Sequence, residues 1–340
     1  MRKSLLIVSL ALGLAALALA QGGTVLLNAA GATFPYPIYS KWFDVYHSAH
    51  PDVQINYQSI GSGGGIRQLL AGTVDFGASD GPMTDEQLAQ AKFKILHFPT
   101  VLGAVVPTYN IAGISGELNF TQKALAGIYL KTITKWDDPE IAKTNSGVKL
   151  PDADIVVVHR SDGSGTTYIW TDFLAKVSEE WKKKVGNAAT SVNWPVGLGG
   201  KGNEGVTGLV KQTPNAIGYI ELIYAVQNNI PYGKVQNAAG NFIKADLAGV
   251  TAAATAYANN IPPDFRVSIT NPPGPKVYPI SSFTWLLIPA QIQDAAKREA
   301  IKDFLKWMLT EGQKYNEGLS YAQLPKEVIV KETQAISLIQ

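Results

Sequence analysis

The residues from Arg160 to Thr167 combine a permanent positive charge with hydroxyl groups and glycines. They read Arg-Ser-Asp-Gly-Ser-Gly-Thr-Thr, follow the apolar run 155–158, and precede a segment with helical spacing. The first turn of a helix has backbone N–H groups without intrahelical partners, and these groups are partly positive. Glycine lets them approach an oxyanion closely, and Arg160 adds a planar set of donors. This loop therefore has the chemistry of an anion-binding site.

Apolar residues recur every three or four positions behind this loop, which predicts one helix as far as Trp181. The recurring residues are Trp170, Phe173, Leu174, Val177 and Trp181. Three more Gly-rich loops precede expected helices, at 31–34, 61–65 and 197–205. A single loop of this kind is typical of a strand-to-helix turn in which Ser or Thr caps the helix. Because such loops recur in both halves of the chain, we expect a cleft lined from two sides.

The chain alternates between expected strands and helices, which favours an α/β fold with parallel sheets. We expect a helix at 35–47 and strands at 54–60 and 74–80. In open α/β sheets, ligands bind beyond the carboxyl ends of the strands, where the Gly-rich loops lie. A length of about 320 residues after the leader suggests two domains of roughly 150 residues each. Five tryptophans are expected to serve in core or rim packing and not as ligand platforms, namely Trp42, Trp136, Trp170, Trp181 and Trp285.

Residues 1–20 have the composition of a secretory signal peptide. Arg2 and Lys3 precede an apolar run that ends in Ala-Leu-Ala before Gln21, as at a cleavage site. The alternative is a membrane anchor, but the run has about 16 residues against roughly 20 for a membrane span. The sequence contains no cysteine, which excludes lipidation at an N-terminal cysteine and any disulfide. We therefore expect an exported, unlipidated periplasmic protein.

Net charge and residue usage argue against several function classes. Without Arg2 and Lys3, the chain has 27 basic and 27 acidic residues, so it lacks the positive field that binds nucleic acid. Four histidines and no cysteine support no transition-metal site. The glycine spacing at 197–202 matches a dinucleotide fingerprint, but Lys201 interrupts it. We expect no nucleic-acid partner, no metal and no cofactor.

A serine nucleophile would need a base within reach, and His159 is the candidate. Adjacent residues of a strand point to opposite faces, so His159 should point away from the cleft if Arg160 faces it. We therefore expect that the protein is not an enzyme. A secreted phosphatase remains the alternative from a different class.

The motifs together resemble the PstS family, the periplasmic phosphate-binding proteins of bacterial ABC importers. The resemblance runs from about Leu27 to near Leu324. It rests on segments that occur in one order, at 30–35, 57–65, 74–80, 135–139, 160–166 and 197–203. It implies binding of inorganic phosphate, delivery to the permease subunits of a membrane ABC transporter, and a monomer. A receptor for another tetrahedral oxyanion, such as sulfate, is the alternative within this class.

The resemblance also implies a fold of two α/β domains joined by a hinge. The first domain is discontinuous and consists of 21–108 and 280–340, and the second is 109–279. The chain is expected to cross between the lobes near 106–110 and to return near 280–284.

Residue by residue, the resemblance implies a phosphate site with contributions from both domains. Its expected members are Thr33, Phe34 through its amide, Ser62, Asp80, Arg160, Asp162, Ser164, Gly165 and Thr166. Asp162 is expected to orient Arg160, with a helix cap as its alternative role. Asp80 would repel an anion unless a proton lies between them, and phosphate near neutral pH keeps a proton that sulfate lacks. Asp80 is thus expected to select phosphate, and its alternative role is a turn cap before Gly81.

Overall fold

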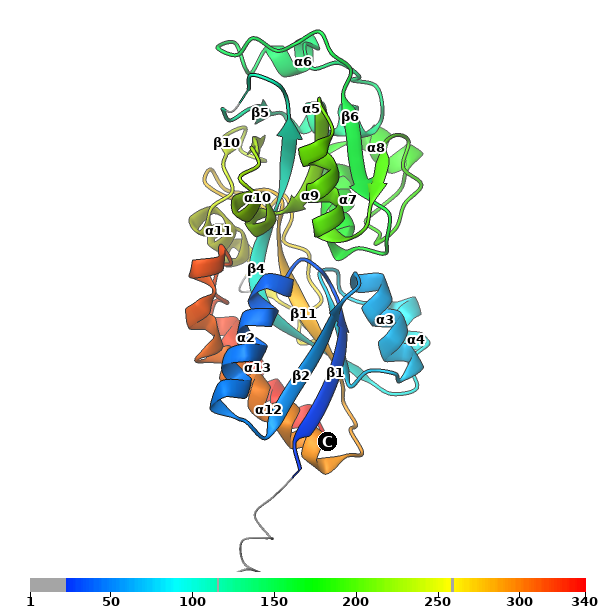
Figure 1. The fold of residues 1–340 in the computed structure, drawn as a ribbon, viewed down its shortest axis with the longest axis vertical. Helices are drawn as coiled ribbons and strands as arrows, with labels where there is room; N and C mark the ends of the chain where they lie inside the picture. The colour runs from blue at the N-terminus through cyan, green and yellow to red at the C-terminus, as the bar shows by residue number, and fades with distance from the viewer. Residues whose placement is uncertain (1–22, 115, 258–259) are drawn as a thin grey trace, which may run out of the picture.

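The computed structural model describes residues 23–114, 116–257 and 260–340. The expected signal peptide at 1–20 lies outside these residues. Two α/β lobes are stacked along the long axis of the molecule (Figure 1). Within the described residues, no helix is long and apolar enough to cross a membrane.

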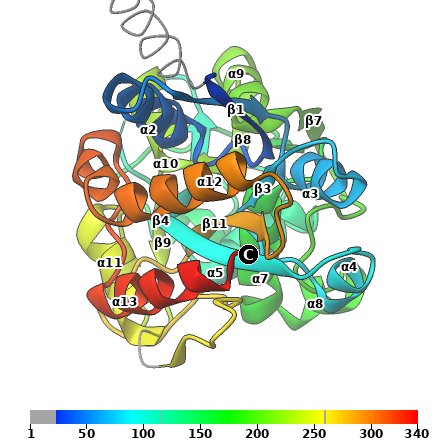
Figure 2. The same ribbon diagram turned by 90° about the horizontal axis from the view of Figure 1, so that it is seen from below.

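The lower lobe in Figure 1 contains elements from both ends of the chain. They are β1 (Val25–Gly31), α2 (Tyr36–Ala49), β2 (Val53–Ser59), α3 (Ser62–Ala71), β3 (Phe76–Ser79), α4 (Asp85–Ala89), α12 (Ala295–Leu309), η2 (Gly312–Tyr315), η3 (Glu317–Leu319), α13 (Lys326–Ala335) and η4 (Ile336–Leu338). The C-terminal helices α12 and α13 thus return to the lobe in which the described chain begins (Figures 1 and 2). This arrangement confirms the expected discontinuous domain.

The upper lobe is formed by the middle of the chain. Its elements are β5 (Asn119–Phe120), α5 (Gln122–Tyr129), α6 (Pro139–Ala142), β6 (Val156–Arg160), α7 (Gly165–Val177), α8 (Glu179–Lys184), β7 (Leu198–Gly200), α9 (Gly202–Gln212), β8 (Ala216–Glu221), α10 (Leu222–Asn228), β9 (Lys234–Gln236), β10 (Phe242–Ile243) and α11 (Leu247–Tyr257). Two long strands, β4 (Ile95–Asn110) and β11 (Ser281–Pro289), connect it to the lower lobe.

One sheet runs through both lobes in the order β2-β1-β3-β11-β4-β8-β6-β7, beside a small sheet β10-β9-β5. The strands that lead into the Gly-rich loops pair in parallel, β1 with β2 and β3, and β6 with β7 and β8. The connecting strands β4 and β11 pair antiparallel with each other and with their neighbours. The expectation of parallel sheets is therefore wrong between the lobes. The chain enters the upper lobe on β4 and returns to the lower lobe on β11 beside it, so these two strands run in opposite directions.

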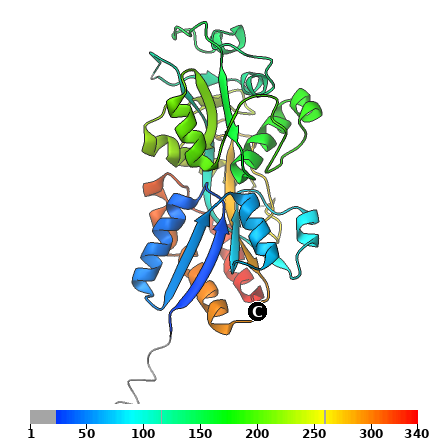
Figure 3. The same ribbon diagram turned by 45° about the vertical axis from the view of Figure 1, so that its right-hand side comes forward.

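The strand β4 changes its partner in the middle of its length. It pairs with β11 over residues 95–104 and with β8 over 105–110. Figure 3 shows β4 and β11 passing together between the lobes. The expected crossings near 106–110 and 280–284 lie on these two strands, while the domain limits at 108 and 280 stay predictions.

Local sequence explains where the helices begin and end. The helix expected at 35–47 is α2, and the strand expected at 54–60 is β2. The helix expected to reach Trp181 instead ends at Val177, because Ser178 is extended. The Ser178 hydroxyl accepts a bond from the Trp181 backbone N–H at 3.1 Å and so starts a new helix, α8. The expected core tryptophans are all buried.

Residues 264–270, the connecting segment between α11 and β11, contact both lobes. The Arg266 guanidinium donates to the Asp85 carboxylate at 2.7 Å on the lower lobe. Four residues later, the Thr270 hydroxyl donates to the Asp172 carboxylate on α7, and Lys176 of α7 donates to the same hydroxyl at 2.8 Å. This segment therefore ties α4 to α7, the helix that follows Arg160.

Candidate functional site

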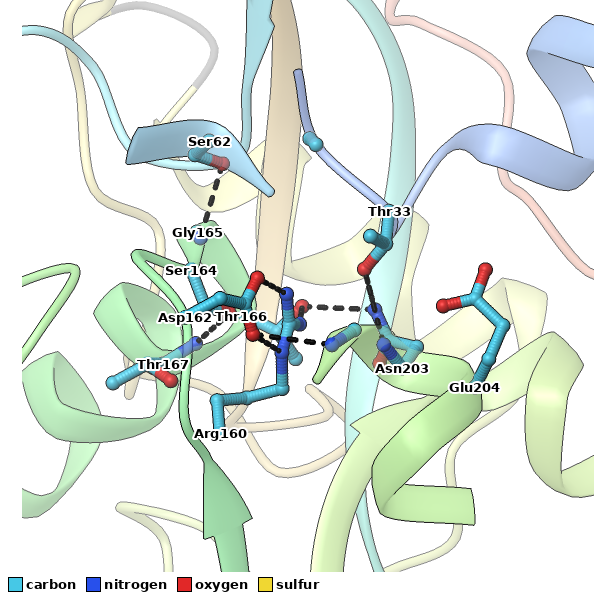
Figure 4. Close-up of polar contacts among 12 residues, drawn as sticks. Thr33, Ser62, Arg160, Asp162, Ser164, Gly165, Thr166, Thr167, Asn203 and Glu204 are labelled. Atoms are coloured by element: carbon cyan, nitrogen blue, oxygen red, sulfur yellow. Dashed lines mark hydrogen bonds and ion pairs between the residues drawn. The ribbon is translucent and has the colours of Figure 1, made fainter. Parts of the chain in front are cut away.

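The Gly-rich loops of the two lobes meet between them (Figure 4). The Ser62 hydroxyl of the lower lobe accepts a bond from the Gly165 backbone N–H of the upper lobe at 3.0 Å. On the other side, the Thr33 hydroxyl accepts a bond from the Asn203 side-chain amide at 2.8 Å. All nine expected site residues lie in these loops or at the adjacent strand and helix ends. The lobes are thus closed onto one polar site.

Arg160 is the charged donor of the site, and its side chain is 1% exposed. It donates to both oxygens of the Asp162 carboxylate along one edge of the guanidinium, Nε to Oδ1 at 2.8 Å and Nη2 to Oδ2 at 2.6 Å. Burial disfavours the ionised form of Asp162, but the bonds from Arg160 outweigh it and hold the pKa of Asp162 below its usual value. The remaining Nη1 donates to the Thr166 hydroxyl at 3.2 Å. Asp162 is therefore placed to orient Arg160.

The helix cap expected as an alternative role of Asp162 belongs to Ser164. The Ser164 hydroxyl accepts a bond from the Thr167 backbone N–H at 3.0 Å at the start of α7. The next residue, Gly165, needs to lack a side chain. A Cβ at Gly165 would lie 2.5 Å from both Asp80 Oδ2 and Ser62 Oγ. The start of α7 can therefore approach the lower lobe to backbone distance only with glycine at this position.

Asp80 follows β3 and is 1% exposed. Its Oδ1 accepts a bond from the Thr284 hydroxyl at 2.9 Å. Burial raises the pKa of Asp80 to about 7, against the opposing effects of the Thr284 bond and the Arg160 charge. The turn cap that was the alternative role of Asp80 is supplied by Ser79, whose hydroxyl accepts a bond from the Gly81 N–H at 3.2 Å. Asp80 is thus left to face the site.

The loop after β1 contributes buried groups on the opposite side of the site. Thr33 is 2% exposed, and its carbonyl accepts a bond from the Tyr224 hydroxyl of the upper lobe at 2.6 Å. The Phe34 ring is buried in the core, and its carbonyl accepts from the Tyr321 hydroxyl at 2.6 Å. These bonds fix the backbone of the loop at the cleft.

Sequence reasoning missed two polar side chains that belong to this site. Asn203 bonds the Thr33 and Thr166 hydroxyls, at 2.8 and 3.1 Å, and so spans the cleft. Asn203 lies in the Gly-rich loop at 197–205, which was expected to line the cleft, so the sequence could have indicated it as a site residue. Thr284 lies on β11, far from any loop motif, and only the pairing of β11 with β3 places it beside Asp80.

His159 points away from the site, as predicted from its position on the strand. Its ring stacks on Trp194 with centroids 4.9 Å apart and an interplanar angle of 15°. Across the parts of the chain that the structure covers, no three His, Cys, Asp or Glu side chains are grouped so as to hold a metal ion.

The site combines one guanidinium, two carboxyl groups of different pKa, several hydroxyls and a helix N-terminus. Hydroxyls, backbone N–H groups and one arginine can satisfy the oxygens of a buried tetrahedral anion without a large net charge. A carboxyl group among them favours an anion that still carries a proton. The arrangement thus has donors for most ligand oxygens and an acceptor for one ligand proton.

Comparisons with known proteins agree with this geometry. The chain matches the PBP superfamily domain over residues 18–311. It is 46% identical over 316 residues to the phosphate-binding protein PstS of Xylella fastidiosa, covering 93% of this chain and 85% of that protein.

Solved structures share the fold at lower identity. One is a high affinity periplasmic phosphate-binding protein (PfluDING) bound with phosphate, with a TM-score of 0.73, 23% identity, and coverage of 91% of this chain and 93% of that one. Another is a putative phosphate ABC transporter substrate-binding protein with bound phosphate from Clostridium perfringens, with a TM-score of 0.63, 20% identity, and coverage of 88% and 100%. The fold, the identity to PstS and the matching length together show that the chain belongs to the PstS family of phosphate-binding proteins within the PBP superfamily.

Proposed function

We propose that this protein binds inorganic phosphate between its lobes and delivers it to the permease subunits of a membrane ABC importer. It acts as a monomer in the periplasm, after removal of residues 1–20, and carries out no covalent chemistry. The observation that carries the proposal is the buried Asp80 carboxyl, which lies beside the start of α7 and within the field of Arg160.

The donors of the site are assigned to the phosphate oxygens by their position. Arg160, the hydroxyls of Thr33 and Ser62, and the groups at the start of α7 lie close together between the lobes (Figure 4). The Phe34 amide and the Ser164, Gly165 and Thr166 groups complete the set, and Asp162 holds Arg160 in place.

Asp80 supplies the selectivity. Phosphate near neutral pH can donate its proton to the carboxylate, whereas sulfate has no proton to donate and meets a negative charge. A site built to hydrogen-bond a ligand group can reject the analogue that lacks it by a factor of about 10⁴ to 10⁵. The same site therefore binds phosphate and excludes sulfate.

Binding is coupled to closure of the lobes. The proposed moving parts are 21–108 with 280–340 on one side and 109–279 on the other, joined by β4 and β11. Donors come from both lobes, so only the closed state offers the full set of hydrogen bonds, and phosphate shifts the population toward it. The closed, loaded form is the one presented to the permease.

Calorimetric titrations of the mature chain with phosphate, sulfate and a phosphate monoester test the proposal. We expect one phosphate site per chain, much tighter binding of phosphate than of sulfate at pH 8, where Asp80 is mostly ionised, and no release of phosphate from the ester. Preferential binding of sulfate would make the protein a receptor for a different oxyanion. Steady release of phosphate, abolished by substitution of one Ser or Asp, would make it a phosphatase.

A further inference from the structure

The hydroxyl of Thr284 meets the carboxyl of Asp80 because of how β11 pairs with β3. The antiparallel register places Leu286 opposite Ala78 and Trp285 opposite Ser79. The next pair in this register is Thr284 and Asp80. Both side chains are buried, and the hydroxyl donates to Oδ1 at 2.9 Å.

An irregularity in the neighbouring strand holds Thr284 in this position. Along the β4 and β11 pair, Thr284 lies opposite Val101 but Trp285 lies opposite Pro99, so Thr100 is an additional residue on β4. Such a bulge changes the direction of side chains near functional sites. Here the Thr100 hydroxyl donates to the Thr284 carbonyl at 3.2 Å and bonds the Tyr39 hydroxyl at 2.9 Å. The buried hydroxyls of Tyr39 and Thr100 thus form a hydrogen-bonded chain that ends at the Thr284 backbone.

The position of Thr284 decides which oxygen of Asp80 faces the ligand. A hydroxyl has one hydrogen to donate, and the nearby acceptors of Thr284 are Asp80 Oδ1 at 2.9 Å and the Ser79 carbonyl at 3.4 Å. The shorter bond occupies Oδ1. The other oxygen, Oδ2, is the one that lies beside Gly165 and Ser62, where the donors of the upper lobe meet the lower lobe. Any proton shared with a ligand therefore lies at Oδ2.

The other titratable groups near Asp80 come from several elements. They are Arg160 and Asp162 from the β6–α7 loop, Glu221 from the end of β8, Tyr39 from α2, Tyr57 from β2, and Tyr321. Burial raises the pKa of the three tyrosines further above neutral, so these side chains stay neutral. Burial also raises the pKa of Glu221 well above its usual value, whereas Asp162 stays ionised beside Arg160. Asp80 is the carboxyl of this set that accepts the Thr284 hydroxyl, so the Thr284 variants report on its titration.

We propose that Thr284 is a positioning residue for selectivity, which directs Asp80 Oδ2 at the ligand and favours the ionised, accepting form of the carboxyl. This inference rests on the proposed function and adds a residue that no loop motif contains. The bond from Thr284 favours the ionised carboxylate, since a hydroxyl donor stabilises the charged form. Removing the bond makes Asp80 easier to protonate, and a protonated Asp80 donates to sulfate instead of repelling it.

The test is the pH dependence of sulfate and phosphate binding, measured by calorimetry between pH 5 and 9. In the parent chain we expect sulfate binding to strengthen as the pH falls through the titration of Asp80. Thr284→Val keeps the shape of the side chain and removes the donor, so the midpoint should move up by roughly one pH unit, with about fivefold tighter sulfate binding at pH 8. Thr284→Ser keeps the donor and should keep the parent midpoint.

A midpoint that stays in place in Thr284→Val, while phosphate still binds, would overturn the inference, since a purely structural role changes affinities without moving a pH profile. Thr284→Ala removes the same donor without a second methyl group and replaces Thr284→Val if that variant does not fold. Failure of the proposed function gives a different result, because the parent would then bind no phosphate. In that case the Asp80 carboxyl titration, followed by carbon-13 NMR, should still shift upward in the variants without a hydroxyl.

Discussion

Asp80 and Asp162 lie in the same cleft, but their pKa values are shifted in opposite directions. Asp162 is bound through both oxygens by Arg160, which holds its charge in place. Asp80 accepts one hydroxyl bond and is otherwise desolvated, so its pKa rises to about 7. One carboxylate thus accepts two bonds from Arg160, and the other is the proposed acceptor for the proton of the ligand.

Replacing Asp80 with asparagine should change selectivity more than affinity for phosphate. In Asp80→Asn an acceptor becomes a group that can also donate, and the repulsion of a fully ionised oxyanion disappears. We expect the preference for phosphate over sulfate to fall by at least about tenfold, roughly 1.4 kcal/mol. Paired calorimetric titrations at one pH and ionic strength measure this, with Asp44→Asn on the exposed face of α2 as the control. An unchanged preference in a folded variant would contradict the selectivity role.

Replacing Arg160 with lysine should weaken phosphate binding without abolishing it. The charge remains in Arg160→Lys, but the planar donor set that binds Asp162 and Thr166 is lost. We expect a loss of about 1–3 kcal/mol in binding free energy, the range for hydrogen bonds to charged groups. Arg298→Lys on α12 is the matched control. Equal phosphate affinity in the parent and Arg160→Lys would place Arg160 outside the binding site.

At the scale of elements, the sequence predicts those helices, strands and loops that depend on neighbouring residues in the chain. The Gly-rich loop at Arg160 and the helix behind it are visible as residue types and spacing, and the structure contains both. The break at Ser178 is less visible, because the apolar spacing continues to Trp181 while a single hydroxyl starts a second helix. Asp80 could be named from its motif, but Thr284 could not, since their contact depends on pairing between β3 and β11.

The helix α13 contains an acidic residue whose burial has a cost at high pH. Glu332 is fully buried, and neither carboxyl oxygen has a hydrogen-bond partner within the described residues. Burial raises the pKa of Glu332 well above its usual value. In the pH range between the unfolded and folded pKa values, the folded state binds more protons than the unfolded state. The contribution of Glu332 to stability therefore falls as the pH rises above its unfolded pKa.

Replacing Glu332 with glutamine should remove this dependence on pH. We expect the free energy of unfolding of Glu332→Gln, relative to the parent, to be greater at pH 8 than at pH 5, by on the order of 1 kcal/mol or more. Chemical denaturation at both pH values measures the difference. The exposed Glu327→Gln on the same helix is the control and should show no such change. An equal difference at pH 5 and 8 would mean that Glu332 is ionised in the folded protein.

At the scale of the whole molecule, closure depends on bonds that only the closed state can form. One of these is the bond from the Tyr224 hydroxyl of the upper lobe to the Thr33 carbonyl of the lower lobe, at 2.6 Å. Tyr57 makes a comparable bond to the Ala32 carbonyl at 2.7 Å, but both partners belong to the lower lobe. Substitutions of Tyr224 and Tyr57 therefore distinguish an effect on lobe closure from an effect on the stability of the lower lobe.

Replacing Tyr224 with phenylalanine should open the lobes and weaken phosphate binding. Affinity falls with the fraction of molecules that can bind, and one neutral hydrogen bond contributes about 0.5–1.5 kcal/mol. This free energy corresponds to a roughly two- to tenfold loss of phosphate affinity. Without phosphate, we also expect a larger radius of gyration in small-angle scattering. Tyr57→Phe should lower stability alone. An identical scattering profile for Tyr224→Phe and the parent would contradict a role in closure.

Residues 264–270 reduce the ways in which one lobe can move against the other. Alone, β4 and β11 form a two-stranded ribbon, which can both bend and twist. The segment contacts α4 through Arg266 and α7 through Thr270, so twisting of the ribbon would pull against these side chains. We therefore expect the lobes to move against each other by rotation about a single axis. Two distances across the mouth of the cleft, measured with pairs of spin labels, should therefore change in a fixed ratio at every degree of opening.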